Sequence, residues 1–351
     1  MKNTFALVCL ILFALAMTGA EHKWDPLPLA LSNNAVAAAK VDKHLFIYSF
    51  MGIGEKKTWD AIINRAFELD AQTGKWTEIR PVPGPAGRLA ASAVTVKDLV
   101  YLLGGYTLDS KGDETSVKSV EVWVPGRNVW YRGNDMPTPL DNSVIGVYHD
   151  RYIYTISGWS QTQAVRNVQL YDSEKDVWKE ATPIPGSAIF GHAGSIVGDT
   201  VIYVDGAHQN PSGDNPQYLL SDECWMGKIG HHDPSKIEWT KIANHPGKPR
   251  YRMAAGASEH DQKIYFSGGA EELHDYKGLG AEGRPAEPSP VTFAWNLRTS
   301  KWEIINDKTP NPTLDNRGLL VTPEGLVRIG GMEAGQKVTT RVAVLPLKEK
   351  K

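Results

Sequence analysis

The sequence predicts an all-β fold in which six repeated units of four short strands form the blades of a propeller, and three observations predict it. Glycine (33), proline (22), tryptophan (11) and tyrosine (13) are abundant in the 351 residues, a mixture that favours short strands joined by turns over long helices. An apolar strand that ends in glycine recurs along the chain, followed each time by a loop, another strand and, in most units, a tryptophan. Those tryptophans are roughly fifty to sixty residues apart, which is close to the period of four-stranded propeller blades.

The clearest unit occupies residues 88–130. It reads "RLAASAVTVKDLVYLLGGYTLD" and then "SVEVWVPGRNVW", ending at Trp130. The same order ends at Trp178, Trp239 and Trp302, and a looser unit ends at Trp76. The extra residues of the longer units fall in the loop after the glycine step, so we expect the insertions to collect on one face of the disc.

The last unit, "LVRIGGMEAG…RVAVLPLKEKK", has no tryptophan at its end. Trp24, in "HKWDPLPL", precedes Trp76 by about one blade length and is followed by prolines, as are the blade ends "KWTEIRPVPG" and "VWKEATPIPG". We therefore predict that an N-terminal strand at Trp24 joins the C-terminal blade and closes a ring of six blades, which removes two loose sheet edges.

The first twenty residues, "MKNTFALVCLILFALAMTGA", form a separate segment. One early lysine, an apolar run from Phe5 to Met17 and small residues at the end predict a secretory signal peptide that is cleaved near Ala20. The alternative is an uncleaved membrane anchor, for which the apolar run is short. We expect a periplasmic or secreted protein whose residues 21–351 form a single propeller domain, with no membrane span after cleavage.

Charge and cysteine content exclude two classes of protein. The chain has 38 basic and 40 acidic side chains and a formal net charge of −2, so it lacks the basic surface that nucleic-acid binding needs. Cys9 lies in the predicted signal peptide, which leaves Cys224 alone in the mature chain. A secreted scaffold held together by disulfides is therefore excluded.

The blade pattern resembles the kelch family. The glycine pairs of that family are found at Gly104-Gly105, Gly268-Gly269 and Gly330-Gly331. An aromatic or apolar residue stands seven positions before the blade tryptophan at Leu69, Trp123, Tyr171 and Trp295. The resemblance covers residues 22–347 and implies a propeller fold. It does not imply one function, because kelch propellers include enzymes, binding modules and scaffolds.

Among exported kelch propellers, the chain is similar to the N-acetylneuraminate epimerase family, the periplasmic sialic acid mutarotases. Both have a signal peptide and a long loop after the glycine pair of the fifth blade, here "AEELHDYKGLGAEGRPAEPSP". In that family the loop holds a tyrosine and a His-Glu-Gly step. Here these are Tyr276 and Ala281-Glu282-Gly283, with alanine in place of the histidine.

Galactose oxidase is a more distant relative within the kelch fold. Its copper centre needs two tyrosines, two histidines and a cysteine linked to a tyrosine, and Cys224 has no matching ligand pattern around it. A copper oxidase of this kind is therefore disfavoured. We expect no cofactor and no metal.

Candidate site residues come from two parts of each blade. The polar starts of the inner strands and the loops of one face converge on the propeller axis. The candidate catalytic residues, all from the fifth-blade loop, are Glu271, Glu272, His274, Tyr276 and Glu282. The candidate substrate-binding residues are Arg88, Asn142, His192, His208, Arg252, Arg284 and Arg317.

Alternative structural roles stand beside these. Arg88 and Arg252 fit hydrogen bonding around the ring, and His192, among glycines, fits a core histidine. As ligand-facing side chains, Arg252 and Glu282 would contribute to binding and little to stability.

Two functions remain open from the sequence. The first is action on a carbohydrate or sugar acid, with mutarotation as its most concrete form. That reaction needs a base for the anomeric hydroxyl and an acid for the ring oxygen, and an arginine suits a sugar carboxylate. The second is a non-catalytic propeller whose loops bind a protein partner or a cell-envelope polymer.

Overall fold

The computed structural model describes residues 24–84 and 86–347, and it confirms the all-β propeller. The expected signal peptide lies outside the described residues. Five antiparallel sheets have four strands each, in sequential order from the axis outward. The first contains β1 (Ala35–Val41), β2 (His44–Phe50), β3 (Ala66–Asp70) and β4 (Lys75–Ile79); the second contains β5 (Ser92–Val96), β6 (Leu99–Leu103), β9 (Val120–Val124) and β10 (Val129–Gly133).

The next three sheets repeat this plan. The third contains β11 (Val144–Tyr148), β12 (Tyr152–Ser160), β13 (Gln163–Asp172) and β14 (Val177–Ala181). The fourth contains β16 (Ala193–Val197), β17 (Thr200–Val204), β20 (Cys224–Ile229) and β21 (Ile237–Ile242). The fifth contains β22 (Ala254–Ser258), β23 (Lys263–Ser267), β24 (Thr292–Asn296) and β25 (Lys301–Asn306). A further sheet has three strands, β26 (Leu320–Thr322), β27 (Gly325–Ile329) and β30 (Val342–Leu345).

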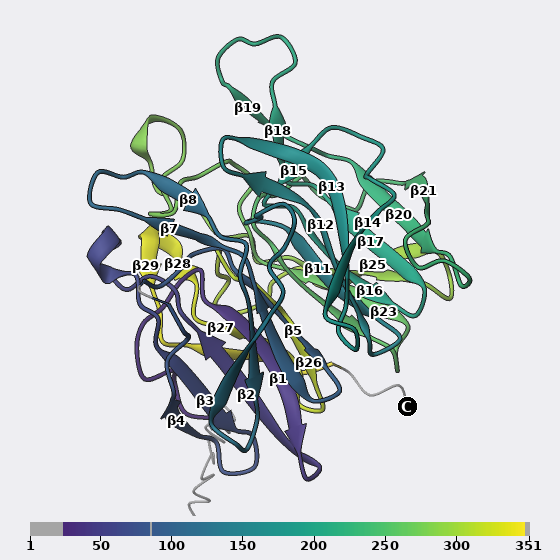
Figure 1. The fold of residues 1–351 in the computed structure, drawn as a ribbon. Coiled ribbons are helices and arrows are strands. Elements are labelled where there is room, and N and C mark those ends of the chain that lie inside the picture. Colours follow the sequence, from purple (N-terminus) through teal and green to yellow (C-terminus); the bar gives the residue numbers. More distant parts are fainter. Residues whose placement is uncertain (1–23, 85, 348–351) are drawn as a thin grey trace, which may run out of the picture.

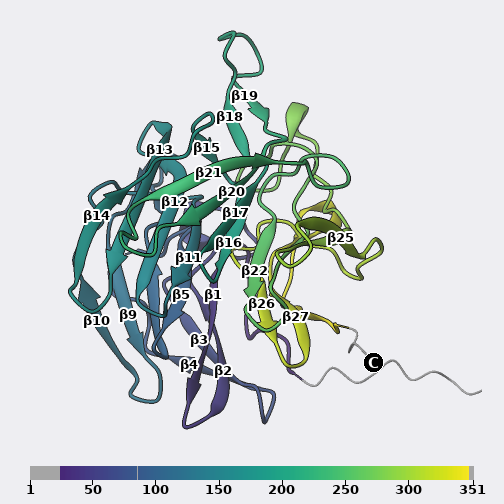
Figure 2. The ribbon, with the colours of Figure 1, turned by 90° about the vertical axis from the view of Figure 1, so that its right-hand side faces the viewer.

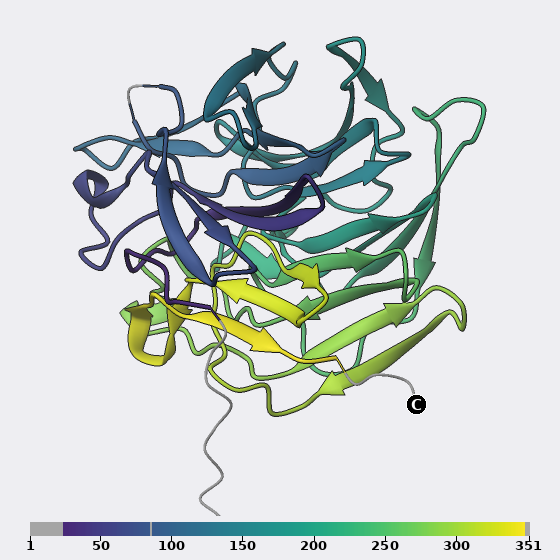
Figure 3. The same cartoon turned by 90° about the horizontal axis from the view of Figure 1, so that it is seen from below.

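The position of each strand follows from its sequence. β17 reads Thr-Val-Ile-Tyr-Val and is buried at all five residues, as a strand between two packed blades must be. In the outer strand β4, the two apolar residues Trp76 and Ile79 are half-buried, and the three polar residues are exposed. The inner strands β1, β5, β11, β16, β22 and β26 contact one another in that order, and β26 contacts β1. Figure 3 shows the same closure, with the purple start of the chain beside its yellow end.

The blade tryptophans connect each sheet to the one before it. The Nε1 atoms of Trp130, Trp178 and Trp302 donate to carbonyl oxygens just after the last strand of the preceding blade, at 2.7–3.0 Å. Trp239 does the same at 3.3 Å, and Trp76 donates to the Asp25 carbonyl at 2.9 Å. This repeated hydrogen bond explains why the tryptophan recurs once per blade.

The N-terminal segment departs from the expected strand pairing. From Trp24 onward it adds no strand to the β26–β27–β30 sheet, although the Leu27 amide donates to the carbonyl of Thr340, just before β30, at 2.8 Å. Pro26 and Pro28 flank Leu27 and have no amide hydrogen, so neither can donate to a strand ladder. The part of the expected strand that precedes Trp24 lies outside the described residues.

Trp24 nevertheless joins the two ends of the ring. Its side chain is 2% exposed and packs in one cluster with Ile47 and Phe67 of the first blade and Val327 of the last. Its Nε1 atom donates to the Ala71 carbonyl at 2.9 Å.

We expect Trp24→Ala to lower the free energy of unfolding by about 3 kcal/mol, because it removes a large buried side chain and leaves a carbonyl unpaired. Chemical denaturation measures this change. An unchanged unfolding midpoint would contradict the closure role of Trp24, and Trp59→Ala, at a residue that is 50% exposed, is the control.

The insertions lie on one face, as the spacing predicts. The hairpins β7 (Tyr106–Leu108) with β8 (Glu114–Ser116), and β18 (Ala207–Gln209) with β19 (Tyr218–Leu220), stand on the upper side in Figure 1. Figure 2 shows β18 and β19 at the top again after the molecule is turned. We call this side the loop face. The remaining short elements are β15 (Ile189–Phe190), β28 (Met332–Glu333), β29 (Lys337–Val338), η1 (Trp59–Ala61), η2 (Ala281–Gly283) and η3 (Ala334–Gln336). None of the described helices is long and apolar enough to cross a membrane.

Candidate functional site

Six residues, one before the inner strand of each sheet, share an unusual backbone conformation. We call them the axial ring: Asn33, Ala90, Asn142, Gly191, Arg252 and Asp315, all with φ between 49° and 63°. Their backbones bond around the axis, since the amides of Asn142, Gly191 and Arg252 donate to the ring residue before them at 2.8–3.3 Å. Left-handed backbone costs roughly 1 kcal/mol or more per non-glycine residue. The ring therefore holds its side chains at fixed places near the axis.

A cavity of about 460 Å³ opens above the axial ring on the loop face. One of its walls is aromatic. Trp159 at the end of β12, Phe190 of β15 and Tyr218 of β19 meet edge to face, with ring centroids 5.1–5.9 Å apart. Tyr251 continues this wall, 5.8 Å from Phe190. We call this space the loop-face cavity, and its aromatic wall suits a ligand with an apolar face.

Charged side chains also line the loop-face cavity, next to Tyr251. The guanidinium of Arg252 lines the cavity, and its Nη1 donates to Asp315 Oδ1 at 3.1 Å and to the Asp275 carbonyl at 3.3 Å. His274 Nε2 lies 3.3 Å from Asp315 Oδ2. Burial by itself would raise the pKa of Asp315, but the charges of Arg252 and His274 outweigh it and hold that pKa well below its usual value. The guanidinium of Arg252 also lies against Tyr251, with its central carbon 4.7 Å from the centroid of that ring.

Asp141 is a carboxyl of the cavity wall that can change between its charged and neutral forms close to neutral pH. It is 2% exposed and lines the cavity. Burial raises its pKa to about 6, against hydrogen bonds from Ser116 and Asn142 that lower it. Ser116 Oγ donates to Oδ2 at 2.7 Å, and Asn142 Nδ2 donates to Oδ1 at 2.8 Å.

Glu114 of β8 lines the same cavity near its opening. Partial withdrawal from water raises its pKa; the positive charge of Arg252 opposes that effect and Asp275 adds to it. The cavity thus contains two carboxyls whose pKa values are above normal, which is the usual setting of acid and base groups.

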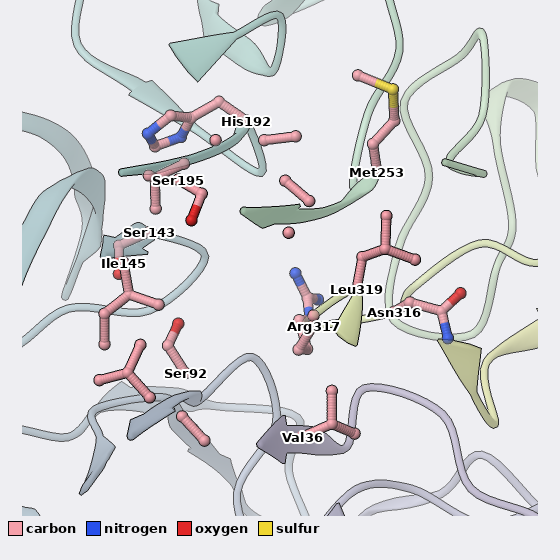
Figure 4. Close-up of a pocket in the computed structure, with 18 of the residues that line it drawn as sticks. Val36, Ser92, Ser143, Ile145, His192, Ser195, Met253, Asn316, Arg317 and Leu319 are labelled. Carbon is pink, nitrogen blue, oxygen red and sulfur yellow. The ribbon is translucent and has the colours of Figure 1, made fainter. Parts of the chain in front are cut away.

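A second, narrower space of about 180 Å³ continues along the axis below the ring. Figure 4 shows Ser92, Ser143 and Ser195 around it, with Arg317 projecting into its middle. We call it the axial channel. Asn142 and Arg252 line both spaces, so the axial ring is the boundary between the cavity and the channel.

Several sequence-predicted residues come together here. His274, Arg252 and Asn142 line the loop-face cavity, and Arg317 and His192 line the axial channel. Nε2 of His192 lies 2.9 Å from the Ile156 carbonyl, and burial lowers the pKa of its ring to about 3, so it is neutral.

Other predicted residues lie away from both spaces. Arg88 is buried against Glu121 at 2.6 Å, with further bonds to Ser119 and the Gly104 carbonyl, so its hydrogen bonds stay within the second blade and do not run around the ring. His208 is on β18, where its Nδ1 lies 2.9 Å from the Gln209 carbonyl.

The tip of the fifth-blade loop also points elsewhere. Glu282 and Arg284 are exposed and lie 3.7 Å from each other, and Glu271 pairs with Lys248 at 3.0 Å. Tyr276 packs against the buried cluster that contains Leu89. The carboxylate of Glu272 lies against Gly280, where a Cβ atom would come within 2.4 Å of it.

Sequence reasoning did not single out Glu114, Trp159, Phe190, Tyr106 or Tyr251. Two signals were available. Glu114 is in the insertion after a glycine pair, and Phe190 and Tyr251 stand immediately before axial-ring residues, as Asp141 does. The position before the ring residue is thus a second source of site residues in the third, fourth and fifth blades.

The described residues contain no group of three or more His, Cys, Asp or Glu side chains placed to hold a metal ion. Cys224 is buried as a free thiol, and burial raises its pKa to about 12, so its thiolate is not formed at neutral pH.

Comparison with known proteins places the chain among kelch propellers. Kelch-like protein 15 of Mus musculus is 23% identical over 274 residues, covering 78% of this chain and 43% of that protein. Kelch-like protein 38 of Mus musculus is 26% identical over 230 residues, covering 56% and 38%. The chain thus spans less than half the length of these curated relatives.

A solved structure titled "Structure of YjhT" has a TM-score of 0.73 at 19% identity and covers 94% of this chain and 99% of its own. At that identity the likeness shows a shared fold. The KLHDC2/KLHL20/DRC7 Kelch-repeats domain matches residues 33–269. With the tryptophan-linked blades and the axial ring, this match confirms the kelch resemblance, and the chain belongs to the KLHDC2/KLHL20/DRC7 Kelch-repeats domain family.

Proposed function

We propose that the protein binds a carbohydrate in the loop-face cavity and accelerates the exchange of its anomers. The observation that carries this proposal is the buried carboxyl of Asp141, with a pKa of about 6, in a cavity that also has an aromatic wall. Aromatic faces stack on the apolar C–H face of a sugar ring, and carboxyls and guanidinium groups bind its hydroxyls and any carboxylate.

The proposed reaction needs only proton transfers. The Asp141 carboxylate takes the proton of the anomeric hydroxyl, the bond from the anomeric carbon to the ring oxygen breaks, and Glu114 gives a proton to the ring oxygen. The open-chain carbonyl then rotates and closes on its other face, with the two carboxyls in reversed roles. Acid and base groups work best with pKa values near the working pH, and burial raises the pKa values of both Asp141 and Glu114 toward it.

The similarity to the N-acetylneuraminate epimerase family supports a sugar acid as the substrate, with the guanidinium of Arg252, which lines the cavity, as the group that receives the carboxylate. We propose, from the apolar run at residues 5–17, that the protein is exported to the periplasm or secreted.

The test is the rate at which a freshly dissolved pure anomer equilibrates, followed by NMR with and without protein. The panel contains N-acetylneuraminate, glucuronate and galactose. Faster equilibration of at least one sugar supports the proposal. No acceleration across the panel overturns the enzyme, and saturation-transfer signals without acceleration would indicate a non-catalytic binding propeller instead.

A pair of variants tests the location of the site. We expect Trp159→Ala to weaken sugar binding about tenfold, because a stacking surface is lost. We expect Glu282→Ala to change nothing, because this side chain is exposed and lies outside the cavity. Titration calorimetry measures both affinities. Weaker binding by the Glu282 variant with normal binding by the Trp159 variant would move the site to the loop tip.

A further inference from the structure

The side chain of Arg317 crosses the propeller axis. It comes from the segment before β26 in the last blade, and its Nη1 donates to Asn142 Oδ1 of the third blade at 2.9 Å. Nε donates to Asn33 Oδ1 at 3.0 Å, and Nη2 also bonds Asn33 Oδ1 and lies 3.4 Å from Asp315 Oδ1. The side chain is only 8% exposed. A guanidinium held by three axial-ring residues has its orientation fixed.

Asn142 is the link between this arginine and Asp141. The axial ring holds its backbone on both sides, because its amide donates to Ala90 and its carbonyl accepts from Gly191. Its side-chain amide could still lie in two orientations, with either Oδ1 or Nδ2 facing Arg317 and the other atom facing Asp141. Oδ1 faces Arg317, and Nδ2 faces Asp141 Oδ1 at 2.8 Å.

The two orientations of this amide differ strongly in energy. Arginine has only donors, so a reversed amide would set the NH₂ group against the guanidinium N–H. It would also set the amide oxygen against the Asp141 carboxylate, an arrangement that is acceptable only when Asp141 carries a proton.

We propose that Arg317 is a positioning residue for Asp141, which acts by holding the Asn142 amide in the orientation that donates to the Asp141 carboxylate. The side chain predicted to bind substrate thus works from the channel side of the ring. The catalytic consequence rests on the proposed function, whereas the ionisation of Asp141 can be followed in the free protein.

Other groups face Asp141 and must be separated from this effect. They are Ser116 and Glu114 of β8 and Tyr106 of β7. The negative charge of Glu114 raises the pKa of Asp141, and the positive charge of Arg317 lowers it directly, in addition to its action through Asn142. A double-mutant cycle divides the direct from the indirect contribution.

The experiment follows the ¹³C signal of the Asp141 carboxyl against pH, with Asp141→Asn to assign it. We expect a wild-type midpoint of about 6. Arg317→Met should raise the midpoint by about one pH unit. Asn142→Gly, which suits the left-handed backbone, should raise it similarly, and Arg317→Met should add little in the Asn142→Gly background.

The matched control is Arg328→Met. It removes another buried guanidinium of the same blade, which bonds Thr313 and the Pro310 and Asn311 carbonyls. Its Asp141 midpoint should equal the wild type. An unchanged midpoint in Arg317→Met, or the same shift with and without the Asn142 side chain, would overturn the proposal.

A lysine variant covers the case in which Arg317→Met does not fold. Arg317→Lys keeps the charge but replaces the planar fork by one ammonium group. An upward shift then supports positioning, and a wild-type midpoint overturns it. If the titrations behave as expected but no sugar equilibrates faster, the positioning role stands and the proposed function fails.

Discussion

Asp141→Asn is expected to reduce the acceleration of anomer exchange by a factor of about 10² to 10⁴, the usual contribution of a positioned acid–base group. The amide cannot take the proton of the anomeric hydroxyl. The change is nearly isosteric, and the new NH₂ group can donate to Ser116 Oγ, whose hydroxyl turns to accept it. The fold should therefore survive, and near-ultraviolet circular dichroism provides that control.

The pH dependence has a definite direction. Asp141 has a folded pKa of about 6, so the base is present above that pH and the wild-type rate should fall as the pH drops through 6. In the Asp141→Asn variant this acid limb should disappear from the residual rate. A wild-type rate that stays level from pH 7 to pH 5 would remove Asp141 from the role of base.

The second large effect concerns Arg252, for which the sequence suggested a role in binding and little in stability. We expect Arg252→Met to lower the free energy of unfolding by about 3 kcal/mol, because it leaves the fully buried Asp315 carboxylate without its nearest cation. Chemical denaturation at pH 7 measures this. Sugar-acid binding should be lost in the same variant.

A double-mutant cycle gives this prediction its control. Asp315→Asn removes the buried charge, so it should recover part of the stability lost in Arg252→Met. Equal losses that simply add in the double variant would show that the two side chains do not act as a pair.

The pH dependence of Arg252→Met follows from the depressed pKa of Asp315. In the wild type, this carboxylate contributes stability above its usual pKa and loses it only in strong acid, because its folded pKa is lower than its unfolded one. Without Arg252 the folded pKa rises, so acid unfolding should begin at a higher pH. Acid unfolding curves that superimpose for the two proteins would contradict this.

The blades could be read from the sequence because their cause is local and repeated. Each blade needs a buried apolar strand, a glycine step with positive φ, as at Gly104 and Gly268, and a tryptophan that reaches the preceding blade. Each blade packs between two other blades of the same kind, so the same residue types are required in every repeat and the pattern can be recognised in the sequence. The path of the chain after Trp24 was less predictable, because Pro26 and Pro28 have no amide hydrogen to donate to a strand ladder.

The site was predictable only where it lies on the repeat. Arg252, Asn142 and Arg317 stand at the starts of inner strands, and the sequence pointed to all three. Glu282 was named from the polar composition of its loop and from the resemblance to the His-Glu-Gly step of the epimerase family. Neither gives the direction of a side chain, and the side chain of Glu282 is exposed to solvent.

By itself, the sequence determined the propeller, the face that carries the insertions and the residues that stand at the axis. Only the tertiary structure decided what those residues do, because each axial partner comes from a different blade. Arg317 and Asn142 are far apart in sequence and 2.9 Å apart in space, and burial beside Ser116 sets the pKa of Asp141. Distance, burial and charge between distant segments are properties of the folded ring, and no local pattern in the chain records them.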